Sequence, residues 1–171
     1  MNKTDYFQRL SQYNYWMNEK IYLVCESIPD SVRREDKGAF FNSIQGTLNH
    51  ILLADKLWLS RFQNYTFEIE SLRQELIAEF NLLWQERQKI DREIQTYIDS
   101  LTEEKLAESL TFTSKSQKGE CNFPLWHLLL HFFNHQTHHR GQLTTLISQC
   151  GKDFGVTDLL WLPEAELTNR E

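Results

Sequence analysis

The chain has 171 residues, and its 18 Lys and Arg residues against 24 Asp and Glu residues give a formal net charge of −6. An acidic chain without a Lys/Arg run lacks the positive surface that phosphate backbones require, so we expect no nucleic-acid partner. We also expect no membrane association and a cytoplasmic location, because no apolar leader is visible and no apolar stretch approaches about 20 residues.

Six Gly and three Pro residues argue against an all-β fold, and apolar residues at helical spacing predict four long helices. The first covers residues 4–27, with Thr4 as its N-cap and Pro29 just after its end. The second begins near Ser43, a candidate N-cap, and continues to Phe62. It is apolar on nearly every side, which is typical of a helix inside a bundle.

The third predicted helix covers residues 71–100, with Leu72 and Leu76 on its apolar face. Apolar and polar residues then alternate over 109–122 before a Lys118-Gly119 turn, which predicts a short β-hairpin or an extended loop. The fourth helix runs from Pro124 to Cys150, and Gly151 caps its end. A further turn is predicted over 157–161. These elements predict an all-α four-helix bundle, one domain over residues 1–171, with a long crossover or a short hairpin between the third and fourth helices.

Five of the six histidines lie within thirteen residues of the fourth helix. At 100° per residue, His139 falls inside the apolar arc of this helix and His135 at its edge. Outside this arc lie His127, His131 and His138, for which a solvent-exposed or interface role is the natural interpretation. The pair at i, i+4 can bind one metal ion from a single helix, because one turn brings the two rings side by side.

A third ligand has to come from another helix, and His50 on the second helix is the candidate, since Gly46 and Ala54 leave space around its ring. Three imidazoles and one open, water-bearing position form a catalytic type of site for Zn²⁺, Ni²⁺, Fe²⁺ or Mn²⁺. The alternative is that His50 is a hydrogen-bonded core residue. Three widely spaced cysteines fit reduced thiols, and none lies near enough in sequence to suggest a thiolate ligand.

Other polar residues stand where apolar ones are expected. Asn14 and Arg87 interrupt the apolar stripes of the first and third helices, so either side chain can face a cavity inside the bundle. There Asn14 would form a hydrogen bond to a ligand imidazole, and Arg87 would bind an anionic group of the substrate. A structural role is the alternative for both. His131, one turn before His135, can support the site from behind the ligands. Beyond the metal ligands the sequence identifies no catalytic residue. Trp126, Phe133 and Arg140 share the far side of the fourth helix and suit a dimer contact.

Three motifs in order are similar to those of the DinB family, the DinB/YfiT-like metal-binding four-helix bundles rather than the lesion-bypass polymerase of similar name. They are Tyr13-Asn14-Tyr15-Trp16-Met17-Asn18, Gly46-Thr47-Leu48-Asn49-His50-Ile51-Leu52 and Asn134-His135-Gln136-Thr137-His138-His139-Arg140-Gly141-Gln142-Leu143. The resemblance covers almost the whole chain. It implies a bundle with a long crossover, usually a homodimer, and a divalent metal held by His50, His135 and His139, with His138 not a ligand.

The resemblance also implies a range of activities. Related proteins include transferases and isomerases that use low-molecular-weight thiols, and metal-dependent hydrolases. We therefore expect an enzyme that depends on a divalent ion, Zn²⁺ or Ni²⁺, and transfers a thiol sulfur to a small-molecule substrate in stress or detoxification chemistry. A metal-dependent hydrolase is the alternative, for which Asp55 and Glu19 are acidic residues near in sequence. The second alternative is a dimeric protein that binds a metal or a small ligand without turnover.

Overall fold

The computed structural model describes residues 2–114 and 119–163. Its four long helices are α1 (Lys3–Glu26), α3 (Ile44–Phe62), α4 (Phe80–Asp99) and α6 (Leu125–Gln149). The short elements are α2 (Asp30–Arg34), α5 (Glu103–Ala107), the strands β1 (Ser109–Ser114) and β2 (Gly119–Pro124), and a 3₁₀ turn, η1 (Leu159–Trp161). The all-α fold class predicted from the periodicity is confirmed.

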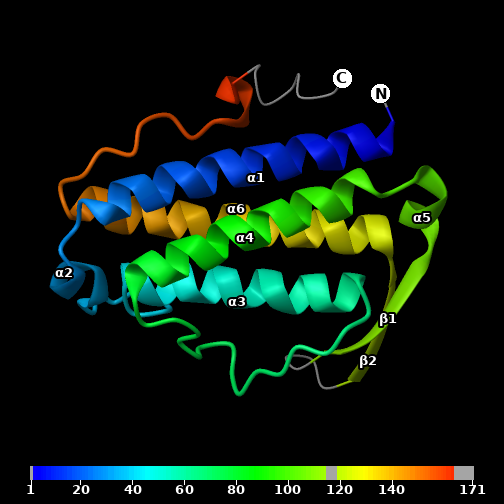
Figure 1. Cartoon of the computed structure of the whole chain (residues 1–171), viewed down its shortest axis with the longest axis horizontal. Coiled ribbons are helices and arrows are strands. Elements are labelled where there is room, and N and C mark those ends of the chain that lie inside the picture. The colour runs from blue at the N-terminus through cyan, green and yellow to red at the C-terminus, as the bar shows by residue number, and fades with distance from the viewer. Residues whose placement is uncertain (1, 115–118, 164–171) are drawn as a thin grey trace.

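The four long helices form a bundle in which each packs against two neighbours (Figure 1). Helix α1 packs on α4 and α6, and α3 packs on the same two helices from the other side. Figure 1 shows α1 and α6 running in one direction and α3 and α4 in the other. The core between them consists of apolar side chains from all four helices, which is the burial that stabilises such a bundle.

The helix ends follow from local chemistry. Ser43 caps α3 by accepting a hydrogen bond from the Gly46 N–H at 3.0 Å, as predicted. Gly151 follows α6 with a φ of 71°, a left-handed conformation that suits glycine, and this cap is confirmed. The predicted cap of α1 is wrong, because Asn2 and Asp5 form a capping box and Thr4 lies inside the helix.

The third predicted helix begins nine residues too early. Residues 63–79 are a loop, and α4 begins at Phe80, where the Glu79 carboxylate accepts hydrogen bonds from the first free N–H groups. Two side chains of α3 bind backbone groups at the end of the loop, in place of the hydrogen bonds that a further helical turn would form. The Ile77 N–H donates to Asn49 Oδ1 at 2.9 Å, and Gln45 Nε2 donates to the Ala78 carbonyl at 3.2 Å.

The long crossover therefore connects α3 to α4, while a hairpin lies between α4 and α6. Figure 1 shows the loop of residues 63–79 returning along α3 from one end of the bundle to the other. Strands β1 and β2 pair antiparallel, with Ser109 opposite Pro124. Of the predicted turn, Lys118 lies outside the described residues. The crossover passes the middle of α3, and the hairpin reaches the end where α3 finishes and α6 begins.

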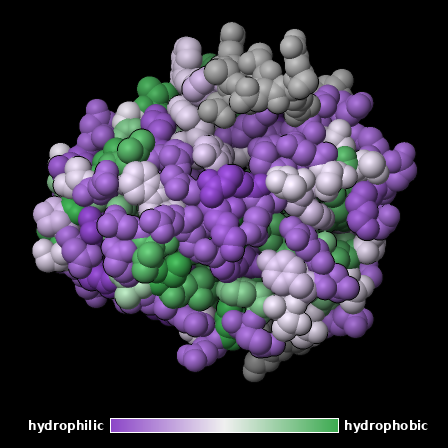
Figure 2. Space-filling model, in the orientation of Figure 1, coloured by the Kyte–Doolittle hydropathy of each residue, from purple (hydrophilic) through white to green (hydrophobic). Residues whose placement is uncertain are grey.

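The face of α6 predicted to form a dimer contact is covered instead by α1. Phe133 stacks on Phe7 with ring centroids 6.5 Å apart, and Arg140 is buried and donates to Asn14. Trp126 alone of the three remains exposed. The view in Figure 2 is mainly hydrophilic, with smaller hydrophobic groups between. Among the described helices, none is both long and apolar enough to cross a membrane.

Candidate metal centre

The three histidines selected from the sequence lie together. His50 comes from the middle of α3, and His135 and His139 come from successive turns of α6. One ligand nitrogen from each lies within 4.8 Å of the others, and the two Nε2 atoms on α6 are 3.1 Å apart. Two nitrogens bound to one tetrahedral Zn²⁺ at about 2.0–2.1 Å lie roughly 3.3 Å apart, so the pair has the spacing that an ion requires.

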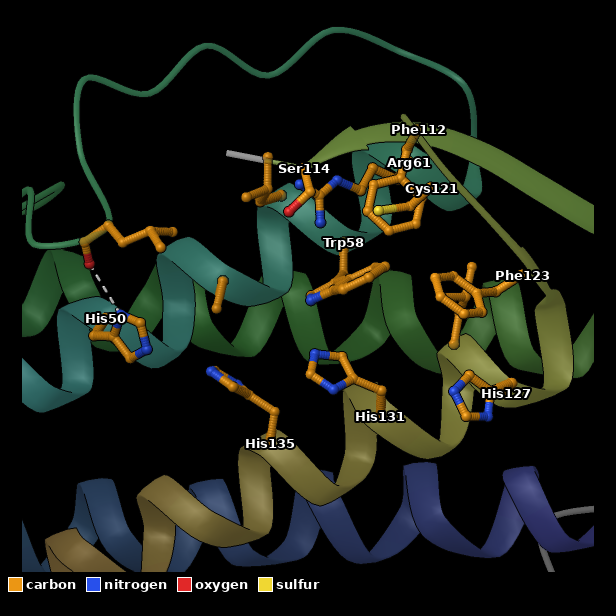
Figure 3. Close-up of a pocket in the computed structure, with 14 residues that line it drawn as sticks. His50, Trp58, Arg61, Phe112, Ser114, Cys121, Phe123, His127, His131 and His135 are labelled. Carbon is orange, nitrogen blue, oxygen red and sulfur yellow. Dashed lines mark hydrogen bonds between the residues drawn. The ribbon is translucent and has the colours of Figure 1, made fainter. Parts of the chain in front are cut away.

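A backbone carbonyl orients His50. Its Nδ1 lies 3.0 Å from the Leu72 carbonyl oxygen in the crossover loop, so Nδ1 carries the proton and donates it (Figure 3). The Nε2 atom then carries the lone pair, and it is buried without a hydrogen-bond partner. A buried nitrogen without a partner is costly. Its position toward the other two imidazoles fits a metal ligand better than a core histidine.

Gln142 orients His139 in the same way. The Nδ1–H of His139 donates to Gln142 Oε1 at 2.8 Å, which leaves its Nε2 free to face His135. The Gln142 amide nitrogen in turn contacts His138 Nε2 at 3.3 Å. The exposed His138 therefore supports the glutamine rather than the ion. Sequence reasoning missed Gln142, although its i+3 spacing from His139 places both on one helix face.

Burial keeps these imidazoles neutral. Desolvation, followed for His135 by the charges of the neighbouring histidines, lowers the pKa of His50 to about 4 and that of His135 to about 3. Desolvation also lowers the pKa of His139. At neutral pH all three therefore offer lone pairs, which is the form that binds Zn²⁺ or Ni²⁺. Because the unfolded chain would bind protons first, this cluster lowers the stability of the metal-free fold as the pH falls below about 6.5.

A close backbone approach covers the cluster on one side. The Phe41 ring stacks on His50 with centroids 3.7 Å apart and meets the His139 ring edge to face at 5.4 Å. This position is possible because residue 46 is glycine. A Cβ on Gly46 would collide with the Phe41 carbonyl oxygen. The space that we expected Gly46 to leave around the His50 ring is therefore filled by the segment that carries Phe41.

Replacing Gly46 by Ala is accordingly expected to displace Phe41. We expect a loss of about 1–3 kcal/mol in the free energy of unfolding and an affinity for Zn²⁺ about tenfold lower. Gly141→Ala is the matched control, because a Cβ there meets no atom within 4 Å and the residue lies in a helix. It is expected to leave metal binding unchanged. Thermal unfolding and a competitive Zn²⁺ titration measure both effects, and equal behaviour of the two variants would contradict the role of Phe41.

Four other residues considered from the sequence are structural. Asn14 and Arg87 do not face the cavity; they belong to a buried network in which Arg87 contacts Asp55 at 2.5 Å and Asp91 at 2.8 Å. Asn14 donates to Asp91, at 3.2 Å, and not to an imidazole. Asp55 is fully buried and binds Arg87, so it is not an available acid or base. The Glu19 carboxylate accepts a hydrogen bond from the Gln88 side chain, which links α1 to α4.

The same network positions α6 beside the histidines. Gln136, next to His135, donates to Asp55 at 2.8 Å, and Arg140, next to His139, donates to Asn14. The network contains two arginines and two aspartates, and through Asn14 it joins all four long helices. A rotation of α6 that moved its histidines away from α3 would therefore break buried hydrogen bonds, which is costly.

A cavity of about 430 Å³ opens beside the cluster. Figure 3 shows it between α3 and α6 under the hairpin, with His135 and His50 at one end and Arg61 and Phe123 toward the other. Apolar and aromatic side chains form most of the lining. His131 also faces the cavity, with its ring 5.2 Å from that of Trp58 and 6.0 Å from that of His135. Desolvation, then the charges of His127 and Arg61, lower the pKa of His131.

Comparisons with known proteins place the chain in a family. The family model described as "DinB family" matches residues 1–171. The protein DinB of Bacillus subtilis (strain 168) is 28% identical over 159 residues, which cover 91% of this chain and 92% of that protein. The matched residues include the helices that carry the three histidines. The chain is therefore a member of the DinB family.

Proposed function

We propose that this protein binds a divalent transition-metal ion, Zn²⁺ or Ni²⁺, through His50, His135 and His139, and that it transfers the sulfur of a low-molecular-weight thiol to a small electrophile. The observation that carries the proposal is the convergence of three neutral imidazoles, two of which, His50 and His135, line one end of a cavity. A bound ion would supply a Lewis acid that favours the thiolate form of an incoming thiol.

The coordination set supports a reactive centre over a purely structural one. Within residues 2–114 and 119–163, no cysteine or carboxylate joins the three histidines. Structural zinc sites are usually closed by four protein ligands, whereas catalytic sites keep one position for water or substrate. A cavity next to the open side gives a substrate access, which favours turnover over storage of an ion.

The lining of the cavity favours sulfur transfer. Trp58, Phe112 and Phe123 offer aromatic surfaces that would hold an apolar electrophile and exclude water. His131 is neutral at pH 7 because desolvation lowers its pKa. In this proposal its imidazole accepts the proton that the thiol loses, and His50 and His135 fix the position of the sulfur. No further acid is required when the leaving group is an anion such as chloride.

A metal-dependent hydrolase is the second candidate, because the same ion can activate water. The cavity offers less to that reaction. No Asp or Glu of the described residues lines it, and Asp55 is held by Arg87 and Gln136. Among the described lining residues, imidazoles and the Cys121 thiol remain to move protons. A homodimer and a role in stress chemistry stay predictions from the family resemblance, and a cytoplasmic location stays a prediction from the sequence.

An assay with 1-chloro-2,4-dinitrobenzene and 6-mercapto-1-hexanol tests the proposal. A carbon–sulfur bond forms, chloride leaves, and the thiol proton passes through His131 to the buffer. A free alkanethiol is almost entirely protonated at pH 7, so we expect the Zn²⁺- or Ni²⁺-loaded protein to accelerate the reaction about tenfold or more. Chelator-treated protein should not accelerate the reaction. No acceleration with either ion would overturn sulfur transfer, and metal-dependent cleavage of 4-nitrophenyl acetate without thiol would then favour the hydrolase.

A further inference from the structure

The end of the cavity away from the histidine cluster holds an arginine that packs against two aromatic rings. The guanidinium carbon of Arg61 lies 4.6 Å from the centroid of Trp58 and 4.5 Å from that of Phe112. Figure 3 shows its side chain reaching into the cavity beside Cys121, under the hairpin. The centroids of these two rings are 5.3 Å apart and their planes are 71° apart, so both rings lie on one side of the guanidinium. They remove water from that side and leave N–H groups for binding.

No acidic partner neutralises this cation within the described ranges. None of the ion pairs formed there includes Arg61, and the described cavity lining contains no Asp or Glu. Arg87 is different, since two carboxylates surround it in the core. Desolvation lowers the pKa of Arg61, which shows that its charge is held at a cost. A planar anion from outside the protein would remove that cost and could bind the free edge through two hydrogen bonds.

We propose that Arg61 binds the carboxylate of an elongated small ligand whose other end lies at the three histidines. A single guanidinium matches one negative charge, so a carboxylate fits better than a dianionic phosphate. Trp58, on which Arg61 stacks, lies two turns after His50 on α3, about 12 Å along the helix. The carboxylate and the group at the histidines are therefore separated by several bonds, with an apolar body between them. The sulfur end of this ligand rests on the proposed function; the carboxylate end does not.

Metal-free protein tests the carboxylate end by itself. Calorimetric titration with 4-phenylbutanoate and with its uncharged analogue 4-phenylbutan-1-ol compares the two ligands at equal apolar surface. We expect wild type to prefer the carboxylate about tenfold or more, as for a charge-assisted pair of hydrogen bonds. Arg61→Met keeps the stacking volume and should reduce the preference to less than about twofold. Arg73→Met is the matched control, since Arg73 also stacks on an aromatic ring, Phe40, but outside the cavity lining.

An unchanged preference in Arg61→Met, or none in wild type, would overturn the assignment. If Arg61→Met does not fold, Arg61→Lys keeps a positive charge without the planar fork and should retain part of the preference. Co²⁺-loaded protein then tests the sulfur end, through the near-ultraviolet thiolate absorption produced by 6-mercaptohexanoate and 6-mercapto-1-hexanol. If both thiols produce the band and calorimetry shows no preference for the carboxylate, only the role of Arg61 is rejected. Absence of the band with both would reject the thiol proposal and leave the calorimetric result standing.

Discussion

The His139→Ala variant is expected to lose its divalent ion. His139 contributes one of three converging nitrogens, and its Nε2 lies 3.1 Å from that of His135. Loss of a residue that only supports a ligand typically lowers metal affinity 10–100-fold, so loss of a ligand should lower it by more than about 100-fold. The measurement is metal content by mass spectrometry, on untagged protein loaded with Zn²⁺ and dialysed. We expect about one equivalent in wild type and almost none in the variant.

His138→Ala is the matched control for this substitution. The two histidines are adjacent in sequence and their rings meet edge to face, with centroids 4.8 Å apart, but His138 is exposed and its polar contact is to the supporting Gln142. We expect it to keep about one equivalent of metal with a modestly lower affinity. Circular dichroism should show both variants folded. Equal retention of the ion by the two variants would remove His139 from the ligand set.

A second large effect is expected from Arg87→Met, this time on stability. Arg87 is 1% exposed and contacts Asp55 and Asp91, so its removal leaves two buried carboxylates without their cation. Breaking such a buried pair costs about 3–5 kcal/mol. For a chain of this length the unfolding midpoint should fall by about 6–20 °C. Thermal denaturation of metal-free protein measures the change without a contribution from the ion.

Lys89→Met on the same helix provides the comparison. Lys89 is 61% exposed and forms an ion pair with Glu93 at 3.8 Å, a surface interaction worth little in water. Its replacement should shift the midpoint by only about 2 °C or less. A shift for Arg87→Met no larger than that of Lys89→Met would show that the buried network does not hold the helices together. The position of α6 beside the histidines would then need another explanation.

The three-histidine cluster was predictable because it depends on helix periodicity. The apolar stripe of the fourth helix identified which of its histidines face the core, and the structure brings His135 and His139 to His50. The ends of α3 and α6 followed from Ser43 and Gly151, whose cap chemistry is local. Local signals of this kind are independent of how distant segments pack.

What the sequence did not predict depends on contacts between distant segments. In the sequence Leu72 belongs to a helical apolar stripe, but the Asn49 and Gln45 side chains hold the end of this segment as a loop. In that loop the Leu72 carbonyl orients His50. The stacking of Phe41 depends on a collision that only the folded chain reveals. Arg87 and Asn14 were correctly found to be unusual, but their carboxylate partners come from other turns and helices.

X-ray absorption spectroscopy of the Zn²⁺-loaded protein tests the central claim most directly, because it counts the atoms around the ion. Three imidazoles with one exchangeable position predict nitrogen or oxygen neighbours at about 2.0–2.1 Å, and one sulfur at about 2.3 Å after addition of 6-mercaptohexanoate. The imidazole contribution should remain while the sulfur appears. Four protein ligands that do not change on addition of thiol would contradict the account and indicate a closed, structural site.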